Sequence, residues 1–262
     1  MDELQWDPEA SRLDAAPFSE CRAIFHLAGE SVGAGLWSEA RKRRILDSRV
    51  RGSRLVADAL AQISAAPTLI QASAIGFYGD AGERWCRESD PAGEGFLAGV
   101  VCDWEGALRP AAAAGSRVVL ARIGLVIGAG GGVLERILPI FKIALGGRIG
   151  DGTQYMSWIT RDDLVSALLH LVEAESVSGP VNLVSPGPVT NAEFTAVLGR
   201  VLARPTLLPL PAFAVRTLMG QMGRELLLFG ARVSCDRLTD TGFSFRYPEL
   251  ELALKGVLSR ET

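Results

Sequence analysis

The sequence predicts an α/β protein built on a parallel sheet, followed by a small α-rich C-terminal subdomain. Short apolar runs rich in β-branched and aromatic residues alternate with longer runs that show helical spacing of apolar positions. Such alternation is typical of βαβ units, in which buried parallel strands are connected by helices. Near Arg204 the composition shifts, and three prolines, Pro205, Pro209 and Pro211, interrupt the chain. We therefore divide the chain at this point, into residues 1–204 and 205–262.

The elements follow one another in a regular order. The apolar runs predict buried strands at residues 23–28, 68–74, 118–127 and 181–184. Between them, apolar positions at helical spacing predict helices at 38–64, 96–114 and 133–145. Two later helices have capping-box starts, Thr160-x-x-Asp163 before residues 164–172 and Thr190-x-x-Glu193 before residues 194–202. Ligands bind at the carboxyl ends of parallel strands, so the loops after Ala28, Ala74 and Ile127 should converge on one crevice.

Composition narrows the choice of partner and compartment. The chain has 262 residues and a formal net charge of −3, which favours a neutral small-molecule or protein partner and disfavours nucleic acid or an anionic membrane surface. Four scattered cysteines without a C-x-x-C pair and only two histidines predict neither a disulfide framework nor a metal site. A cytoplasmic location fits this cysteine usage best. We also keep a second copy of the same chain as a candidate partner, in a homo-oligomer.

Five motifs occur in a fixed order, at residues 26–29 (HLAG), 73–79 (SAIGFYG), 121–128 (ARIGLVIG), 157–165 (SWITRDDLV) and 181–191 (VNLVSPGPVTN). This ordered set resembles the extended short-chain dehydrogenase/reductase superfamily. Further residues are similar to its atypical NAD-dependent epimerase/dehydratase-like branch, which carries a C-terminal domain of unknown function: Glu30, residues 48–50, Trp104-Glu105, the glycines at 130–132 and residues 242–245. The resemblance runs from Trp6 to Leu258 and implies a Rossmann-like fold, NAD or NADP as cofactor and a small-molecule substrate.

The same resemblance predicts a shortened N-terminus. Only 25 residues precede His26, whereas a Rossmann-like strand at this position follows three strands, two helices and a glycine-rich phosphate loop. Residues 1–21 contain no glycine. We expect strands 1 and 2 and the phosphate loop to be missing, with residues 4–6 as a remnant of strand 3. This makes cofactor binding by the truncated chain doubtful.

This chain also departs from the catalytic pattern of the superfamily. Members of the superfamily use an Asn-Ser-Tyr-Lys set, with Tyr-x-x-x-Lys on one helix as the acid/base. The corresponding helix here reads FLAGVV at residues 96–101, without that pair. The serine position falls on Ala74, one beyond Ser73, and the asparagine position is occupied by Arg49. We therefore do not expect the standard reductase mechanism.

Tyr78 and Glu30 are the candidate catalytic residues. Tyr78 follows a strand end and matches a tyrosine that the superfamily often keeps near the cofactor; as an alternative it is an aromatic plug in the loop. Glu30 directly follows the LAG turn, where it can meet substrate or cap the next helix. Arg49 is a candidate for binding a substrate carboxylate or phosphate, or else it pairs with Glu30 or Asp47.

The remaining site residues are implied by the resemblance. It places cofactor contacts at Leu27, Ala28, Gly29, Ser73, Arg122 and Gly124. It also places Gln154 and Trp158 over the substrate, with packing as the alternative for both.

Three functions remain open on the sequence. The first is an NAD(P)-dependent epimerase or reductase acting on an unidentified small molecule. The second is a non-catalytic cofactor-sensing or regulatory protein, since some relatives carry a cell-division-inhibitor label. The third is a truncated, inactive form.

Overall fold

The computed structural model describes residues 5–63 and 66–259, and its centre is a four-stranded parallel sheet. The strand order is β10-β6-β4-β3, formed by β3 (Ala23–His26), β4 (Thr68–Ala74), β6 (Val118–Ile123) and β10 (Gly179–Leu183). The register pairs Ala23 with Thr68, and Leu69 with Val118. Five consecutive residues of β4 are buried, as expected for a strand covered on both faces.

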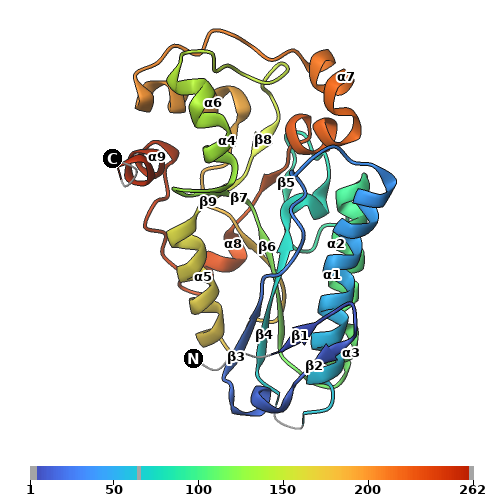
Figure 1. Cartoon of the computed structure of the whole chain (residues 1–262). Helices are drawn as coiled ribbons and strands as arrows, with labels where there is room; N and C mark the ends of the chain where they lie inside the picture. Colours follow the sequence, from blue (N-terminus) through green and yellow to red (C-terminus); the bar gives the residue numbers. More distant parts are fainter. Residues whose placement is uncertain (1–4, 64–65, 260–262) are drawn as a thin grey trace.

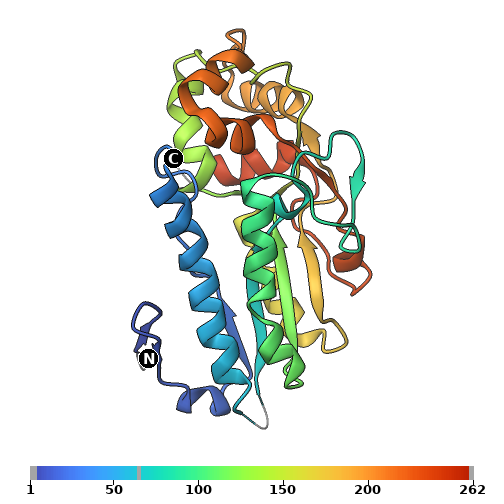
Figure 2. The ribbon, with the colours of Figure 1, turned by 90° about the vertical axis from the view of Figure 1, so that its right-hand side faces the viewer.

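Helices cover both faces of this sheet (Figure 1). On one face lie α1 (Glu39–Leu60), α2 (Phe96–Gly106) and α3 (Arg109–Ala113), and Figure 2 shows α1 and α2 side by side. On the other face lie α5 (Arg161–Glu173) and α8 (Asp236–Thr239). Apolar side chains such as Leu60 and Leu171 are fully buried between the layers, and each contributes about 1.5–3 kcal/mol to folding. The predicted α/β class and parallel sheet are confirmed.

The helix starts follow the sequence signals closely. The Ser38 hydroxyl accepts a hydrogen bond from the N–H of Arg41 at the start of α1. At α6 (Asn191–Leu202) both halves of the Thr190–Glu193 capping box form. At α5 the Thr160 hydroxyl accepts from the N–H of Asp163, but the Asp163 carboxylate accepts from the N–H groups of Arg246 and Tyr247 instead of completing a box. One further helix before residue 204, α4, spans Gly132–Lys142.

Two predicted elements are divided in the structure. The run at 96–114 forms two helices, α2 and α3, because Pro110 begins a new helix. The run at 118–127 forms β6 and a separate strand, β7 (Leu125–Ile127), which pairs with β9 (Trp158–Thr160) instead of extending the central sheet. The break falls at Gly124, where the next N–H, that of Leu125, donates to the carbonyl oxygen of Ser157 at 2.8 Å.

The residues before β3 do not form part of the central sheet. Trp6–Asp7 (β1) and Arg12–Leu13 (β2) form an antiparallel hairpin, followed by a short 3-10 helix, η1 (Ala16–Glu20). The Trp6 ring packs edge-on against His26, with ring centroids 5.5 Å apart. The expectation of a strand 3 remnant is therefore wrong for Trp6, and Leu4 lies outside the described residues.

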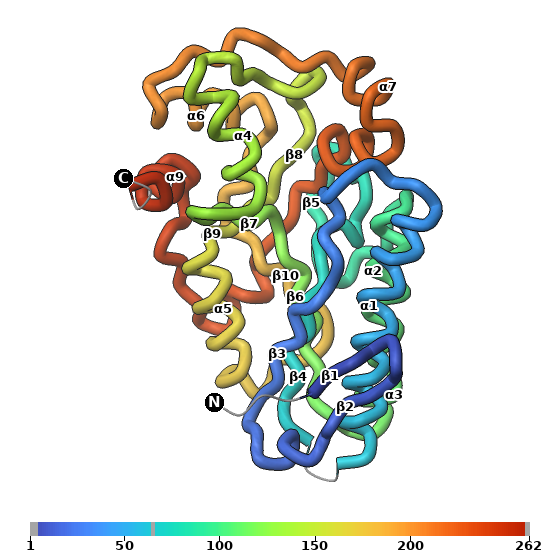
Figure 3. Tube along the Cα trace, in the orientation of Figure 1, coloured from blue at the N-terminus to red at the C-terminus, as the bar shows by residue number. Residues whose placement is uncertain are grey.

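The chain after Arg204 forms the expected helical part, but it packs in two places. It contains α7 (Ala212–Gly223), a π-helical turn η3 (Arg224–Leu228), β12 (Arg232–Val233), α8 and α9 (Leu250–Leu258). Figure 3 shows this part crossing to α7 on one side of the molecule and ending in α9 on the other. There α9 packs on α6, while β12 pairs with β5 (Trp85–Cys86). The boundary at residue 204 stays a prediction.

The short elements at the carboxyl edge of the sheet complete the frame. They are η2 (Ile75–Tyr78), β8 (Tyr155–Met156) and β11 (Val189–Thr190). In the part of the chain that the structure describes, no helix combines the length and apolar character needed to cross a bilayer. The same residues include no cluster of three or more His, Cys, Asp or Glu side chains that would hold a metal ion.

Candidate functional site

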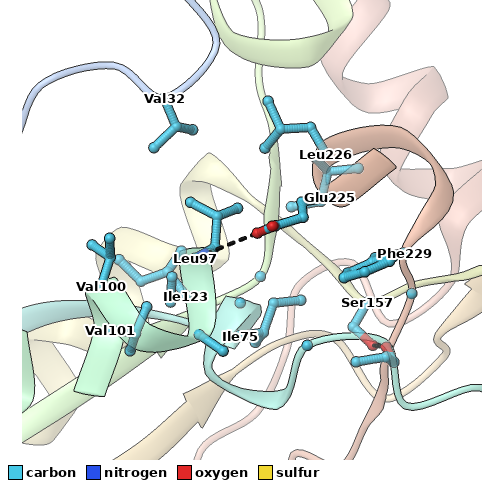
Figure 4. Close-up of a pocket in the computed structure, with 18 of the residues that line it drawn as sticks. Val32, Ile75, Leu97, Val100, Val101, Ile123, Ser157, Glu225, Leu226 and Phe229 are labelled. Carbon is cyan, nitrogen blue, oxygen red and sulfur yellow. Dashed lines mark hydrogen bonds between the residues drawn. The ribbon is translucent and has the colours of Figure 1, made fainter. Parts of the chain in front are cut away.

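A cavity of about 330 Å³ lies at the carboxyl ends of β4 and β6. This is the edge at which open parallel sheets bind their ligands. Ala74 and Ile75 follow β4, and Ile123 and Gly124 end β6. Val32, from the loop after β3, faces the same space (Figure 4). The predicted convergence therefore holds for the loops after β3 and β4. The third predicted loop, after Ile127, is described in full and contributes no residue to the cavity lining, and its place is taken by Ile123 and Gly124 at the end of β6.

One face of α2 forms a second wall. Leu97, Val100, Val101 and Trp104 line the cavity, at the three- and four-residue spacing that places side chains on one side of a helix. Figure 4 shows the first three converging on the same space as Ile123. The sequence predicted a helix here, but these four residues were not among the predicted site residues.

The roof of the cavity comes from the C-terminal part, through Glu225, Leu226 and Phe229. The Glu225 carboxylate accepts hydrogen bonds from the N–H groups of Phe96 and Leu97, both at 2.9 Å, at the first turn of α2. The N-cap of that helix is Gly95, which has no side chain to accept these bonds, and a Cβ there would lie 3.1 Å from a Glu225 oxygen. A carboxylate from 128 residues later thus caps α2 and fixes the roof to the wall.

Arg49 brings a cation to the cavity from α1. Its Nη1 donates to the carbonyl oxygens of Glu30 at 3.0 Å and Ile45 at 3.1 Å, and its guanidinium lies 5.0 Å from the centre of the Trp104 ring. Burial lowers the pKa of Arg49, and the charge of Glu30 opposes that shift. The expected side-chain pairing with Glu30 or Asp47 is wrong, because Glu30 pairs with Arg41 and Arg44, and Asp47 pairs with Arg51.

Below the cavity, a buried ion pair joins the sheet to α2. Arg122 Nε and Nη2 each donate to the Glu105 carboxylate at 2.9 Å, and the Ser73 hydroxyl donates to the same carboxylate at 2.6 Å. The side chains of Arg122 and Glu105 are 4% and 12% exposed. Burial lowers the pKa of Arg122, but the hydrogen bond and charge of Glu105 outweigh it and the net shift is upward.

Comparison with known proteins places these features in a family. The model of the NAD dependent epimerase/dehydratase family matches residues 3–184, and a domain of unknown function matches residues 210–257. This chain belongs to the NAD-dependent epimerase/dehydratase family. An epimerase family protein of Mycobacterium leprae is 44% identical over 259 residues, which are 99% of this chain and 84% of that protein.

Two solved structures of this family's fold are similar to the chain throughout. The human epimerase family protein SDR39U1, crystallised with NADPH, is 33% identical, with a TM-score of 0.85 over 91% of this chain and 82% of that one. A nucleoside-diphosphate sugar epimerase from Corynebacterium glutamicum is 32% identical, with a TM-score of 0.79 over 98% of this chain and 50% of that one. Since the family model matches from residue 3, the doubt about cofactor binding that was based on truncation is not borne out.

Of the two residues predicted to be catalytic, Tyr78 lies in the core of the protein. Its side chain is 1% exposed, and its hydroxyl donates to Asn182 at 2.7 Å and accepts from Arg122 at 3.2 Å. Burial raises the pKa of Tyr78 to about 12, against the opposing effect of Arg122. It is absent from the residues that line the 330 Å³ cavity. A catalytic role for Tyr78 stays a prediction.

Glu30 lies beside the cavity in an ion pair with cations of α1. Its carboxylate accepts from Arg41 at 2.5 Å and from Arg44 at 3.5 Å, and its own N–H donates to the Ser48 hydroxyl. The cap of α1 is Ser38, so the alternative role of Glu30 as a cap is wrong. Contact between Glu30 and substrate stays a prediction.

The predicted cofactor residues occupy two kinds of position. Leu27, Ala28 and Gly29 follow β3 at the carboxyl edge of the sheet, with Leu27 53% exposed. Gly124 lines the cavity, and a Cβ at this position would lie 2.6 Å from the Ser157 carbonyl oxygen. Ser73 and Arg122 instead direct their side chains to Glu105, inside the protein.

Gln154 and Trp158, the two residues predicted to cover the substrate, form hydrogen bonds to the protein backbone. Gln154 Nε2 donates to the carbonyl oxygens of Ile149 at 3.1 Å and Leu227 at 2.8 Å, which ties the roof segment to the loop before β8. Trp158 is fully buried in β9 and donates to the carbonyl oxygen of Gly187 at 2.8 Å. The packing alternative describes the position of Trp158, and its contact with substrate stays a prediction.

Proposed function

We propose that this chain is an NAD(P)-dependent oxidoreductase of the epimerase or reductase type, with a small-molecule substrate bound in the 330 Å³ cavity. The observation that carries the proposal is the apolar cavity at the carboxyl ends of β4 and β6, with Arg49 at its wall. The NADPH complex of the human relative supports the choice of cofactor. Four free cysteines among the described residues agree with the proposed cytoplasmic location.

The described residues fit the nicotinamide end of the cofactor. Ala74, Ile75 and Gly124 supply an apolar wall for a flat ring, and Leu27 to Gly29 lie at the neighbouring strand end. When bound, the nicotinamide supplies or accepts a hydride. The cavity wall offers no phosphate site of its own, because Arg49 is the only Lys or Arg among its lining residues.

Arg49 would orient the substrate. In the described structure the hydrogen bonds of Arg49 all use Nη1, so its Nε and Nη2 keep donors for a substrate oxygen. A cation held by protein stabilises negative charge that develops on a carbonyl oxygen during reduction. The guanidinium does not release its proton, so solvent would supply the proton that completes an alcohol. Arg49 would thereby supply charge stabilisation, but not the proton transfer, of the absent Tyr-x-x-x-Lys pair.

A cofactor titration with matched variants tests this proposal. The full chain is titrated with NADPH and with NADH, by calorimetry and by nicotinamide fluorescence. Ile75→Trp fills the nicotinamide wall and should weaken binding of the preferred cofactor at least ~10-fold. Ile140→Trp, at a side chain 49% exposed on α4, should leave it unchanged. A folded chain that binds neither dinucleotide, or binds one equally well in both variants, would overturn the proposal.

A further inference from the structure

We propose that the substrate is a small neutral molecule with an apolar body and a carbonyl or hydroxyl oxygen, and that the cavity rejects nucleoside diphosphate sugars. This inference rests on the proposed function and adds the chemical class of the substrate. It depends on three features of the cavity: its walls, its charges and its size.

The walls offer apolar contact on several sides. Val32, Ile75, Ile123 and the α2 face form the sides, while Leu226 and Phe229 form the roof (Figure 4). The Ser157 hydroxyl is already used, since it donates to the carbonyl oxygen of Ala231 and accepts from the N–H of Val233. Besides Ser157, the side chains of the lining that carry polar groups on these walls are Arg49, Glu94, Trp104, Tyr155 and Glu225. A polyhydroxylated sugar has more hydroxyl groups than these can match, and each group left unpaired costs about 1–3 kcal/mol.

The charges disfavour an anion. The ionisable residues of the lining with a charge at neutral pH are Arg49, Glu94 and Glu225, one cation against two anions. The first turn of α2 would otherwise be an anion site, because helix N-termini present free N–H groups. These N–H groups are occupied by Glu225, which also accepts from Gln221 at 2.7 Å. A diphosphate would therefore meet a fixed carboxylate at the one place suited to it.

The neighbouring cleft does not supply the missing positive charge. It measures about 900 Å³ and lies beyond Glu94, Glu225 and Phe229. Glu94 and Glu225 line both spaces, so the cavity and the cleft together hold four arginines, Arg49, Arg84, Arg216 and Arg224. These are matched by four carboxylates, Asp80, Glu94, Glu225 and the Asp90 that pairs with Arg84, which leaves no excess positive charge for a diphosphate. Arg84 is paired with Asp90 at 2.7 Å, and Arg224 lies over the Phe229 ring at 5.1 Å.

The size and the remaining donor complete the substrate's description. A volume of about 330 Å³ is near the lower end of the ~300–1,000 Å³ typical of ligand sites. A nucleoside, two phosphates and a hexose together exceed such a space. The proposed nicotinamide would occupy the part against Ala74, Ile75 and Gly124, so the rest has room for a single ring or a short branched chain with one oxygen. The free Nε and Nη2 donors of Arg49 can bind a carbonyl or hydroxyl oxygen, or both oxygens of a carboxylate. Of these, the carboxylate is disfavoured by the two carboxylates of the lining, Glu94 and Glu225.

A matched ligand pair tests the proposal. Acetophenone and 4-acetylbenzoate share one body and differ by a carboxylate, and UDP-glucose is the third probe. Binding of each to the full chain is measured by calorimetry, with and without NADPH. We expect acetophenone to bind at least ~10-fold more tightly than 4-acetylbenzoate, and UDP-glucose not to saturate. Glu225→Gln should lower the ratio of the two affinities, acetophenone to 4-acetylbenzoate, at least ~3-fold. Glu251 is a carboxylate on α9 whose side chain is 39% exposed, and Glu251→Gln should leave the ratio unchanged.

The outcomes separate the substrate class from the proposed function. Saturable UDP-glucose binding, equal or tighter binding of 4-acetylbenzoate, or no binding of acetophenone overturns the apolar substrate class. Failure to bind NADPH overturns the proposed function alone, because the ligand ratio is also measured without cofactor.

Discussion

Replacing Glu105 by alanine should destabilise the fold strongly, because it leaves Arg122 buried without its partner. The Arg122 side chain is 4% exposed, and both hydrogen bonds to Glu105 measure 2.9 Å. Ser73 loses its acceptor in the same change. Breaking a buried ion pair from one side costs about 3–5 kcal/mol. For a chain of this size each kcal/mol corresponds to about 2–4 °C, so the melting temperature should fall by roughly 6–20 °C.

Chemical denaturation and thermal melting followed by circular dichroism measure this loss. Glu39→Ala is the matched control, since Glu39 pairs with Lys42 at 2.9 Å but its side chain is 77% exposed, and its loss should cost less than ~1 kcal/mol. The double variant Glu105→Met/Arg122→Met should recover most of the stability, because no unpaired charge remains. A Glu105→Ala loss below ~1 kcal/mol, or no recovery in the double variant, would refute the reasoning.

Two further predictions concern neighbouring positions. Tyr78→Phe removes the hydroxyl that binds Asn182 and Arg122 and should cost about 1–2 kcal/mol, as measured by urea denaturation. Burial raises the pKa of Tyr78 from 10.0 to about 12, so the contribution of its neutral hydroxyl to the free energy of unfolding is complete below pH 10 and is lost as the pH rises toward 12. Absorbance at ~295 nm should show one tyrosine that titrates at this high pH, and Tyr78→Phe should remove it. Gly124→Ala should destabilise by about 1–3 kcal/mol, since the added Cβ would meet the Ser157 carbonyl oxygen at 2.6 Å. Gly99→Ala, with nothing within 4 Å, should instead stabilise α2 by about 0.5–1 kcal/mol, and equal effects of the two alanines would contradict this account.

Local signals predicted the elements that depend on nearby residues. The strand at 68–74 matches β4 in both bounds, because five consecutive buried residues make up its centre and the short helix η2 begins directly after it. Ser38 and Thr190 set the starts of α1 and α6 through hydrogen bonds within four residues. The break at Gly124 was missed because its cause, the Ser157 carbonyl, lies 33 residues later in the sequence.

The positions of the site residues depend more on long-range contacts than the helices and strands do. Arg49 was selected because it occupies the asparagine position of the family pattern, and the structure places it at the cavity. Ser73 and Arg122 were selected from the family pattern, but their side chains were found in an ion-pair network with Glu105. One available signal was overlooked: Gly95 begins α2 without a capping side chain, which indicates that another residue supplies the acceptor.

The sequence by itself determined the α/β class, the order of strands and helices, the family, and the edge of the sheet where ligands bind. These follow from hydrophobic period, capping residues and ordered motifs, all of which act over short stretches of chain. Only the tertiary structure decided which side chains face the cavity and what charge they give it. Glu225 reaches the first turn of α2 across 128 residues, and it changes that turn from an anion site into a capped wall. The reason is physical: burial, ion pairing and hydrogen-bond satisfaction are properties of neighbours in space, which a sequence pattern does not list.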